Sequence, residues 1–156
     1  MKNVLQYLSD HNILFSKHDH PALFTVEQAK DREDKIPGVH TKNIFIRDKK
    51  KNFYLITLLA HKKLETKIFK LQAWISDFSF ATPEQLQEQL QLTPWSVWIF
   101  WLINNPKIKL YIDQEIWSAE SAWRHPNDNT ATIVINKKWL QDYLQSLSVS
   151  YKVIIL

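Results

Sequence analysis

Glycine is almost absent from this chain, and its absence limits the loops and motifs that the chain can form. Of 156 residues only Gly38 is a glycine, where an average composition would give about eleven. Phosphate-binding loops, dinucleotide-binding motifs and the Gly-x-Ser-x-Gly elbow of serine hydrolases all depend on glycines at fixed spacing. The sequence therefore excludes these classes, and loops that normally use glycine must use other residues.

Length and composition predict one soluble domain. A chain of 156 residues with 45% hydrophobic residues can bury one core but is too short for two domains, so we expect residues 1–156 to form a single domain. No stretch approaches the roughly 18 to 20 apolar residues of a membrane span, so no membrane partner is expected. Cysteine is absent, which excludes disulfides and thiolate chemistry and favours the cytoplasm. The net charge of +4 suits a polyanion such as nucleic acid without requiring one.

The apolar pattern repeatedly changes period, which predicts helices interleaved with strands. Two β-rich runs, His40–Arg47 and Phe53–Leu59, flank the charged segment Asp48–Asn52 in the pattern of a hairpin. Thr82–Gln85 is a capping box and Asn136 caps a last helix. Further helices are expected from Val4 and from Thr25, and further strands at Ile13–Lys17, Lys109–Asp113, Ala131–Ile135 and Val153–Leu156. We therefore expect an α+β fold with a mixed, curved, barrel-like sheet flanked by helices.

Lys42 shares a strand face with hydrophobic residues. Alternation along a β-strand places Lys42 on one face with Ile44 and Ile46. Such a lysine either lays its stem on the core while its ammonium reaches water, or holds the ammonium in a cleft to bind an anion or a developing oxyanion. Asn43 points to the opposite face, although its backbone can border the same site.

Histidines stand in two elements that also contain proline and turn-forming residues. His20 precedes Pro21, and His125 precedes a proline and a run of Asn and Asp residues. Loop geometry alone accounts for both patterns. His18 and His20 would supply at most two metal ligands, so we expect no metal site.

Basic residues gather at the tip of the expected hairpin, at Arg47, Lys49, Lys50 and Lys51. Runs of this kind are commonly solvated turns. If they face a nucleic acid, they contact phosphates and bind without reading sequence.

Six segments, taken in order, resemble the YbaK/ProX family of aminoacyl-tRNA editing domains, and within it the free-standing deacylases that act on mischarged proline tRNA. They are His20–Thr25, Ile36–Gly38, His40–Lys50, Ser79–Ala81, Leu102–Asn104 and His125–Thr132. The resemblance covers nearly the whole chain and implies the fold of those editing domains. It also implies hydrolysis of the ester that joins an amino acid, alanine above all, to the terminal adenosine of tRNA(Pro).

The family pattern implies roles for individual residues. Lys42 would orient the substrate or stabilise the oxyanion, Asn43 would line the site and His125 would border it, which makes these three the catalytic candidates. A ribose hydroxyl beside the ester can activate water, so neither a protein nucleophile nor a cofactor is expected. The substrate-binding candidates are His20, Thr25, Pro37, Gly38, Ser96, Phe100, Asn127 and Asn129, and the tRNA-backbone candidates are Arg47, Lys49, Lys50 and Lys51. The implied partners are the acceptor end of tRNA(Pro) and prolyl-tRNA synthetase, for a monomer or weak dimer.

One segment departs from the family pattern, which usually reads Gly-Ser-Val-Ser/Thr-Pro-Phe-Gly-Leu-Ile-Asn. This chain has Trp95, Ile99 and Trp101 in place of the first Gly, the Pro and the second Gly. Because a tryptophan ring is large and disfavours positive φ, the loop is either rebuilt or fills its own pocket. The alternative function is therefore a catalytically silent tRNA-binding or synthetase-associated module whose pocket holds Trp95, Trp98 and Trp101. A divergent natural member, a binding-only relative and a sequence redesigned on the family backbone all stay open.

Overall fold

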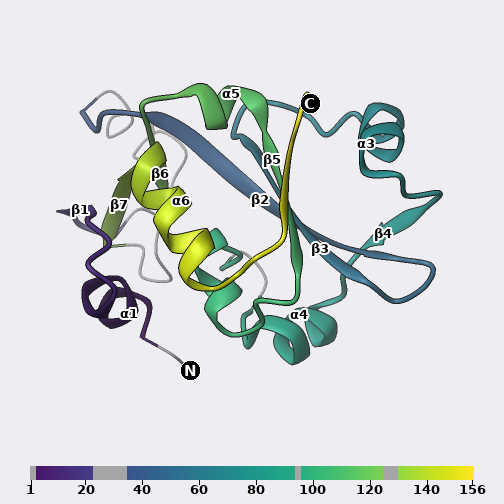
Figure 1. The fold of residues 1–156 in the computed structure, drawn as a ribbon, viewed down its shortest axis with the longest axis horizontal. Coiled ribbons are helices and arrows are strands. Elements are labelled where there is room, and N and C mark those ends of the chain that lie inside the picture. The colour runs from purple at the N-terminus through teal and green to yellow at the C-terminus, as the bar shows by residue number, and fades with distance from the viewer. Residues whose placement is uncertain (1–2, 23–34, 94–95, 125–129) are drawn as a thin grey trace.

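The computed structural model describes residues 3–22, 35–93, 96–124 and 130–156. Within them one eight-stranded sheet has the order β1-β7-β6-β2-β3-β5-β8, with β4 paired to β2 outside this path (Figure 1). The strands are β1 (Ser16–Asp19), β2 (Val39–Asp48), β3 (Phe53–Leu59), β4 (Phe78–Phe80), β5 (Lys109–Asp113), β6 (Ser121–Arg124), β7 (Ala131–Asn136) and β8 (Tyr151–Ile154). The pairs β2·β6, β3·β5 and β5·β8 are parallel and the others antiparallel.

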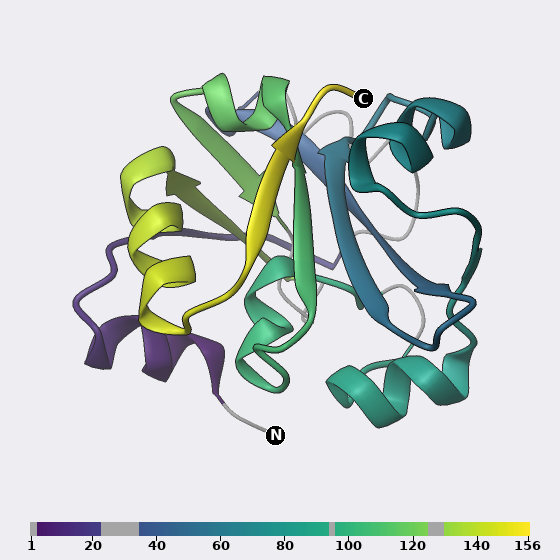
Figure 2. The same cartoon turned by 45° about the vertical axis from the view of Figure 1, so that its right-hand side comes forward.

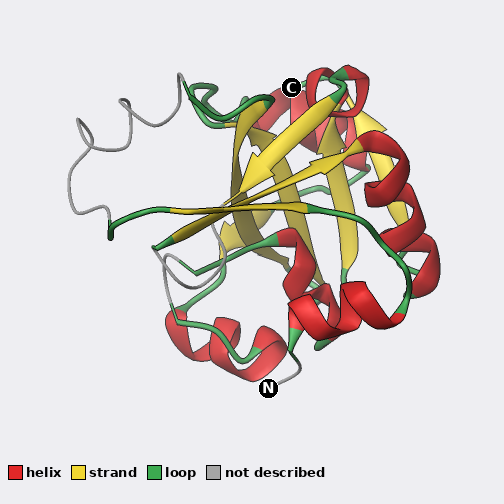
Figure 3. Ribbon diagram, turned by 90° about the vertical axis from the view of Figure 1, so that its left-hand side faces the viewer, coloured by secondary structure: helices red, strands yellow, loops and turns green. Residues whose placement is uncertain are grey.

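Helices lie on both sides of this sheet. They are α1 (Val4–Asp10), α3 (Thr66–Ala73), α4 (Pro83–Leu90), α5 (Gln114–Ser118), α6 (Lys137–Ser146) and the 3-10 helix η1 (Ile99–Ile103). Figures 2 and 3 show that the sheet is strongly twisted between them. This arrangement confirms the predicted α+β class with a mixed, curved sheet. In the described part of the chain, no helix is long and apolar enough to cross a membrane.

The hairpin and the helix caps lie where the sequence predicts them. The Thr82 hydroxyl accepts a hydrogen bond from Gln85 N at 3.3 Å, and Thr82 N donates to Gln85 Oε1 at 3.0 Å, which completes the capping box of α4. The predicted strand at residues 13–17 is wrong in extent, because Ile13 N donates to Leu8 O at 2.9 Å and completes the turn after α1. The last strand is shifted similarly, to 151–154. The helix expected from Thr25 lies outside the described residues.

Turns in this chain use other residues where glycine is common. Trp74 and Gln91, with φ of 60° and 59°, are the C-caps of α3 and α4, a position that glycine often occupies. Lys51 has a φ of 66° in the turn after β2. Gly38 itself has a φ of 107°, and a Cβ there would lie 2.9 Å from the carbonyl oxygen of Ser121. The one glycine therefore stands where β2 begins beside β6, in a place that no side chain fits.

Two hydrophobic cores lie on opposite faces of the sheet around β2. The larger core contains Phe45 and receives α1, α4, η1, α5 and α6. The smaller core contains Ile46 and receives α3 through Phe69 and Ala73, with Ile44 packed against it. Figure 1 shows α3 well separated from α6. Successive residues of β2 therefore point to different cores, odd-numbered residues to the larger and even-numbered residues to the smaller.

Candidate functional site

Among the described strands, none pairs with residues 42–44 of β2 on the side away from β3. On that side β2 pairs with β6 at Val39 and His40 and with β4 from Ile46 to Asp48, and neither register includes residues 42–44. We call this stretch, on the side away from β3, the open edge. It lies between the segments of β2 that pair with β6 and with β4.

The hydrogen bonds of the hairpin decide which backbone groups face the open edge. His40 O accepts from Ala60 N at 2.9 Å, and Asp48 N donates to Asn52 O at 3.0 Å. In an antiparallel pair such bonding alternates, so the even-numbered residues of β2 bond to β3. The N–H and C=O of Asn43 therefore point to the open edge, where within the described residues they have no partner.

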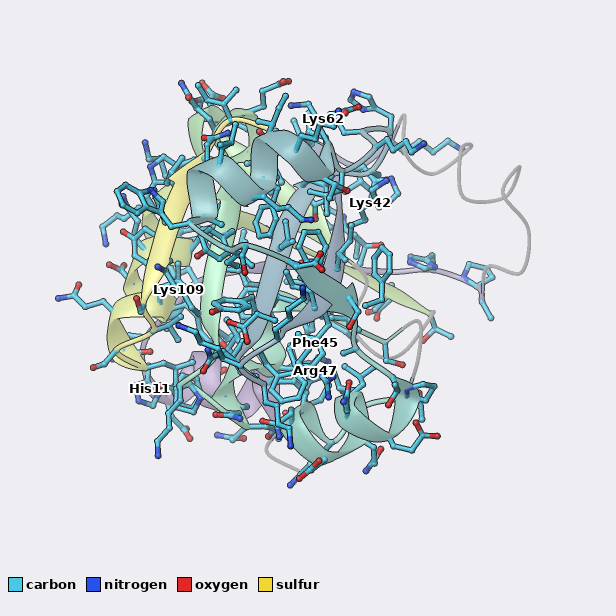
Figure 4. The ribbon with its side chains drawn as sticks, turned by 90° about the vertical axis from the view of Figure 1, so that its right-hand side faces the viewer. His11, Lys42, Phe45, Arg47, Lys62 and Lys109 are labelled. Carbon is cyan, nitrogen blue, oxygen red and sulfur yellow. The ribbon has the colours of Figure 1, made fainter. Side chains whose placement is uncertain are left out.

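Lys42 is a half-buried cation beside this edge. It lies on the even-numbered face of β2 with Ile44 and Ile46, as alternation predicts. Among the described residues it has no hydrogen-bond or ion-pair partner, and Figure 4 shows it toward one end of β2 with Arg47 toward the other. An ammonium group that is partly desolvated and lacks a counter-ion attracts a negative charge. The side chain suits the predicted role of oxyanion or anion ligand, which no contact in this structure tests.

The side chain of Asn43 is already engaged on the other face. Its Oδ1 accepts from Thr57 Oγ1 at 2.7 Å, and its Nδ2 donates to Val97 O at 3.2 Å. Thr57 is fully buried. These bonds fix the amide and tie the segment at Val97 to the sheet, so the side chain of Asn43 positions a loop while its backbone faces the open edge.

The tryptophans of the divergent segment lie on the face of Asn43. Trp98 and Trp101 are 2% and 6% exposed and belong to the larger core, with Phe45. Both indole N–H groups are buried and have no hydrogen-bond partner among the residues that the structure describes. These two rings therefore do not fill the space beside Lys42, which lies on the opposite face. Trp95 lies outside the described residues.

Phe100, a predicted substrate-binding residue, is fully buried in the larger core. Its ring centroid lies 4.6 Å from those of Trp98 and Tyr143, and the Tyr143 hydroxyl donates to Phe100 O at 2.7 Å. These contacts hold η1 against α6.

Comparison with models of known protein families places this chain in one of them. The model of the family described as aminoacyl-tRNA editing domain matches residues 20–143. The chain belongs to this family. The predicted family is thus confirmed, and with it the predicted class of function, hydrolytic editing of aminoacyl-tRNA.

Individual relatives agree with this assignment. The prolyl-tRNA editing protein ProX of Acetoanaerobium sticklandii is 26% identical over 154 residues, 97% of this chain and 94% of that protein. The prolyl-tRNA synthetase associated domain-containing protein 1 of Mus musculus is 27% identical over 125 residues, 74% of this chain and 72% of that protein. The crystal structure of a candidate trans-editing enzyme for prolyl tRNA synthetase has a TM-score of 0.71 at 16% identity, covers 98% of this chain and 95% of that one, and shows the same fold.

The remaining predicted residues of the editing domain fall into two groups. Pro37 and Gly38 are exposed just before β2, and Ser96 is half-buried near Val97, with its hydroxyl 3.1 Å from Thr93 Oγ1. His20 is buried at the end of β1, with Nδ1 2.9 Å from Pro21 O and Nε2 3.1 Å from Thr132 Oγ1. The other group lies outside the described residues and comprises Thr25, His125, Asn127 and Asn129. In the described part of the chain, no three His, Cys, Asp or Glu side chains group in a way that could hold a metal ion.

The basic turn lies at the far end of β2 from Lys42. Lys49 forms an ion pair with Asp77 at 3.2 Å, whereas Lys50 and Lys51 are exposed and have no ion-pair partner in the described residues. Hydrogen bonds from Lys70 and then Lys49 lower the pKa of Asp77 to about 2, so its carboxylate stays charged. Seven residues of strand separate Lys42 from Lys49, roughly 23 Å. The turn therefore lies well apart from Lys42.

Two features of the site were not predicted from the sequence. Phe80 of β4 is 68% exposed and stands opposite Ile46, on the face of Lys42. Lys62 donates to Asp113 Oδ2 at 2.9 Å and to Leu156 O at 2.6 Å, and pairs with Glu115 at 2.5 Å. Burial lowers the pKa of Lys62, but its hydrogen bonds to Glu115 and Asp113 outweigh burial and raise it. Lys62 is thus neutralised where Lys42 is not.

Proposed function

We propose that this editing domain acts in trans as a deacylase of mischarged tRNA(Pro), with alanyl-tRNA(Pro) as its substrate. The observation that carries the proposal is Lys42, a half-buried cation without a counter-ion beside an open strand edge. The neighbouring backbone N–H of Asn43 adds a second donor aimed at the same edge. A lysine ammonium and a backbone N–H next to the ester would stabilise the oxyanion that forms when water attacks it.

The reaction that we propose needs only water and the substrate. A water oxygen attacks the carbonyl carbon of the ester, and the ribose hydroxyl next to the ester accepts the proton of that water. The carbonyl oxygen becomes an oxyanion, stabilised by Lys42 Nζ and Asn43 N–H. The bond between the carbonyl carbon and the ribose oxygen of the ester then breaks, the neighbouring ribose hydroxyl passes a proton to that ribose oxygen in place of the one it received from water, and free amino acid and uncharged tRNA leave.

The relatives support the choice of tRNA. One is named as a prolyl-tRNA editing protein and another as associated with prolyl-tRNA synthetase. We therefore propose tRNA(Pro) as the nucleic-acid partner and prolyl-tRNA synthetase as the enzyme whose errors are corrected. We place the reaction in the cytoplasm, because the chain has no cysteine that an oxidising compartment would pair in a disulfide. The location of Trp98 and Trp101 in the larger core favours this proposal over a silent module with a filled pocket.

The test is the rate of deacylation of alanyl-tRNA(Pro), with seryl- and cysteinyl-tRNA(Pro) compared under the same conditions. We expect Lys42→Ala to lower kcat by about a hundredfold or more, because removal of one oxyanion donor typically costs 10² to 10³. Lys107→Ala, at an exposed lysine just before β5, which β3 separates from β2, is the matched control and should leave the rate unchanged.

Three outcomes are informative. Loss of turnover in Lys42→Ala alone supports the proposed mechanism. Equal loss in both lysine variants would mean that overall charge, not the site, sets the rate. No turnover by the wild type on any of the three substrates, together with retained tRNA binding, would overturn the deacylase and leave the binding module.

A further inference from the structure

Phe80 is an exposed aromatic ring held on a rigid backbone. Its backbone is paired with Ile46 in β2, Ala81 N donates to Phe45 O at 3.0 Å, and Thr82 then caps α4. The ring has 68% of its surface exposed, whereas Phe78, two residues earlier on the same face, packs against the smaller core. Packing therefore explains Phe78 and leaves Phe80 without a structural role.

The register of the sheet places Phe80 and Lys42 on the same face. Residues directly opposite in an antiparallel pair share a face, so Phe80 lies on the side of Ile46, Ile44 and Lys42. From Lys42 to Ile46 is four residues, about 13 Å, and the two long side chains span part of that distance. A cation then stands at one end of this short strip of β2, the half-buried Ile44 lies between, and an exposed aromatic residue stands at the other end.

We infer that Phe80 stacks against the terminal base of the tRNA while Lys42 holds the ester. This inference rests on the proposed function. The geometry fits because the aminoacyl ester and the terminal base belong to one nucleoside, so a site for the ester must have a site for the base next to it. An exposed aromatic side chain is the usual partner for an unpaired base, since every base has a π face. A cation at one end of the strip and a ring at the other match the ester oxygen and the base of one aminoacyl nucleoside.

The test is binding of uncharged tRNA(Pro), intact or lacking its terminal adenosine, to the full chain. For the wild type we expect loss of the adenosine to weaken binding about tenfold, as for one stacked base. Phe80→Ala should weaken binding of intact tRNA by the same factor and leave binding of truncated tRNA unchanged. Phe80→Trp should restore the difference, whereas Phe80→Leu, apolar but not aromatic, should not.

Controls separate stacking from a general loss of surface or stability. Leu14→Ala removes a side chain that is 60% exposed, far along the chain from β4, and should bind both tRNAs as the wild type does. Thermal unfolding of Phe80→Ala should match the wild type, because an exposed ring contributes little to stability. If Phe80→Ala weakens binding of both tRNAs equally, or of neither, the inference is overturned.

The stacking site and the deacylase activity can be contradicted separately. A wild type that binds the terminal adenosine through Phe80 but hydrolyses no ester would retain the stacking site and overturn the deacylase. A wild type that hydrolyses alanyl-tRNA(Pro), with a KM that Phe80→Ala does not raise, would keep the deacylase and overturn the stacking site. If both hold, Phe80→Ala raises KM about tenfold and changes kcat little, because stacking is made equally in the ground and transition states.

Discussion

The two faces of β2 differ in what they do with polar groups and aromatic rings. On the even-numbered face Lys42 has no partner among the described residues, and Phe80, on the same face, is exposed. On the odd-numbered face Asn43 has both ends of its amide bonded, and Trp98 is buried. The side chain of Lys42 is therefore available on one face of the strand, whereas the side chain of Asn43 is already bonded on the other.

This difference shows that two residues adjacent in the sequence can have different roles. Lys42 and Asn43 are adjacent, and the family resemblance assigns both to one site, but their side chains lie on opposite faces of the strand. An uncompensated charge does little for stability and is available for a ligand, whereas a buried amide with two hydrogen bonds mainly stabilises the structure. Substitutions on the two faces should therefore separate activity from stability.

The largest expected effect on stability is at Phe100, on the odd-numbered face. Phe100→Ala leaves a cavity between Trp98 and Tyr143 and should lower the free energy of unfolding by about 3 to 5 kcal/mol. Chemical denaturation monitored by circular dichroism measures this change. Phe80→Ala, which removes the same ring from an exposed position, is the matched control and should change stability by less than about 0.5 kcal/mol. Similar losses of stability in both variants would contradict the difference between the two faces of β2.

Lys42→Met should show the opposite pattern. It keeps the length of the side chain and removes the charge, so we expect kcat for alanyl-tRNA(Pro) to fall by about a hundredfold. The free energy of unfolding should stay the same or rise slightly, because a methionine fits the apolar face of Ile44 and Ile46 without the cost of partly burying a charge. Parallel measurement of deacylation and denaturation checks both. A marked loss of stability would show that Lys42 supports the fold.

The fold class, the hairpin and both helix caps were predictable because each depends on local sequence. The capping box at Thr82–Gln85 is a four-residue signal, and the alternation that puts Lys42 on the face of Ile44 needs only the period of a strand. By contrast α3, β4 and β6 were not predicted. β4 is three residues long and forms only against β2, so its identity comes from tertiary pairing rather than from its own pattern.

The site was less predictable than the fold. That Asn43 bonds Val97, 54 residues away, cannot be read from spacing. The burial of Phe100 follows from the same packing, since a loop with glycines and proline in the family is here a 3-10 helix that turns its rings into the core. The exposure of Phe80 had a signal, because Ser79–Ala81 belongs to the resemblance, but alternation alone does not say which face of an edge strand is covered.

Asn43→Ala tests the satisfied face with a smaller effect. It leaves the Thr57 hydroxyl and the Val97 carbonyl without their partner and should lower the free energy of unfolding by about 1 to 3 kcal/mol. In a Thr57→Val background the same substitution should cost measurably less, because one of the lost hydrogen bonds is already absent. A double-mutant cycle by chemical denaturation gives the coupling. Zero coupling would show that the bond between Asn43 and Thr57 contributes nothing.

The smallest expected effect is at Asp77, which forms ion pairs with Lys49 and Lys70. Asp77→Asn frees Lys49 and should strengthen tRNA(Pro) binding at low salt by about twofold, with the gain lost as salt rises. Because the pKa of Asp77 is lowered from 3.8 to about 2, its contribution to stability is present above pH 4 and is lost as the pH falls through 2. The difference in free energy of unfolding between the wild type and Asp77→Asn should therefore narrow as the pH falls from about 4 to about 2.

Asp142→Asn, in a similar exposed pair with Lys138 on α6, is the control for tRNA binding and should not change tRNA affinity. A gain in affinity in both variants would mean that net charge alone, rather than the turn of β2, guides the tRNA.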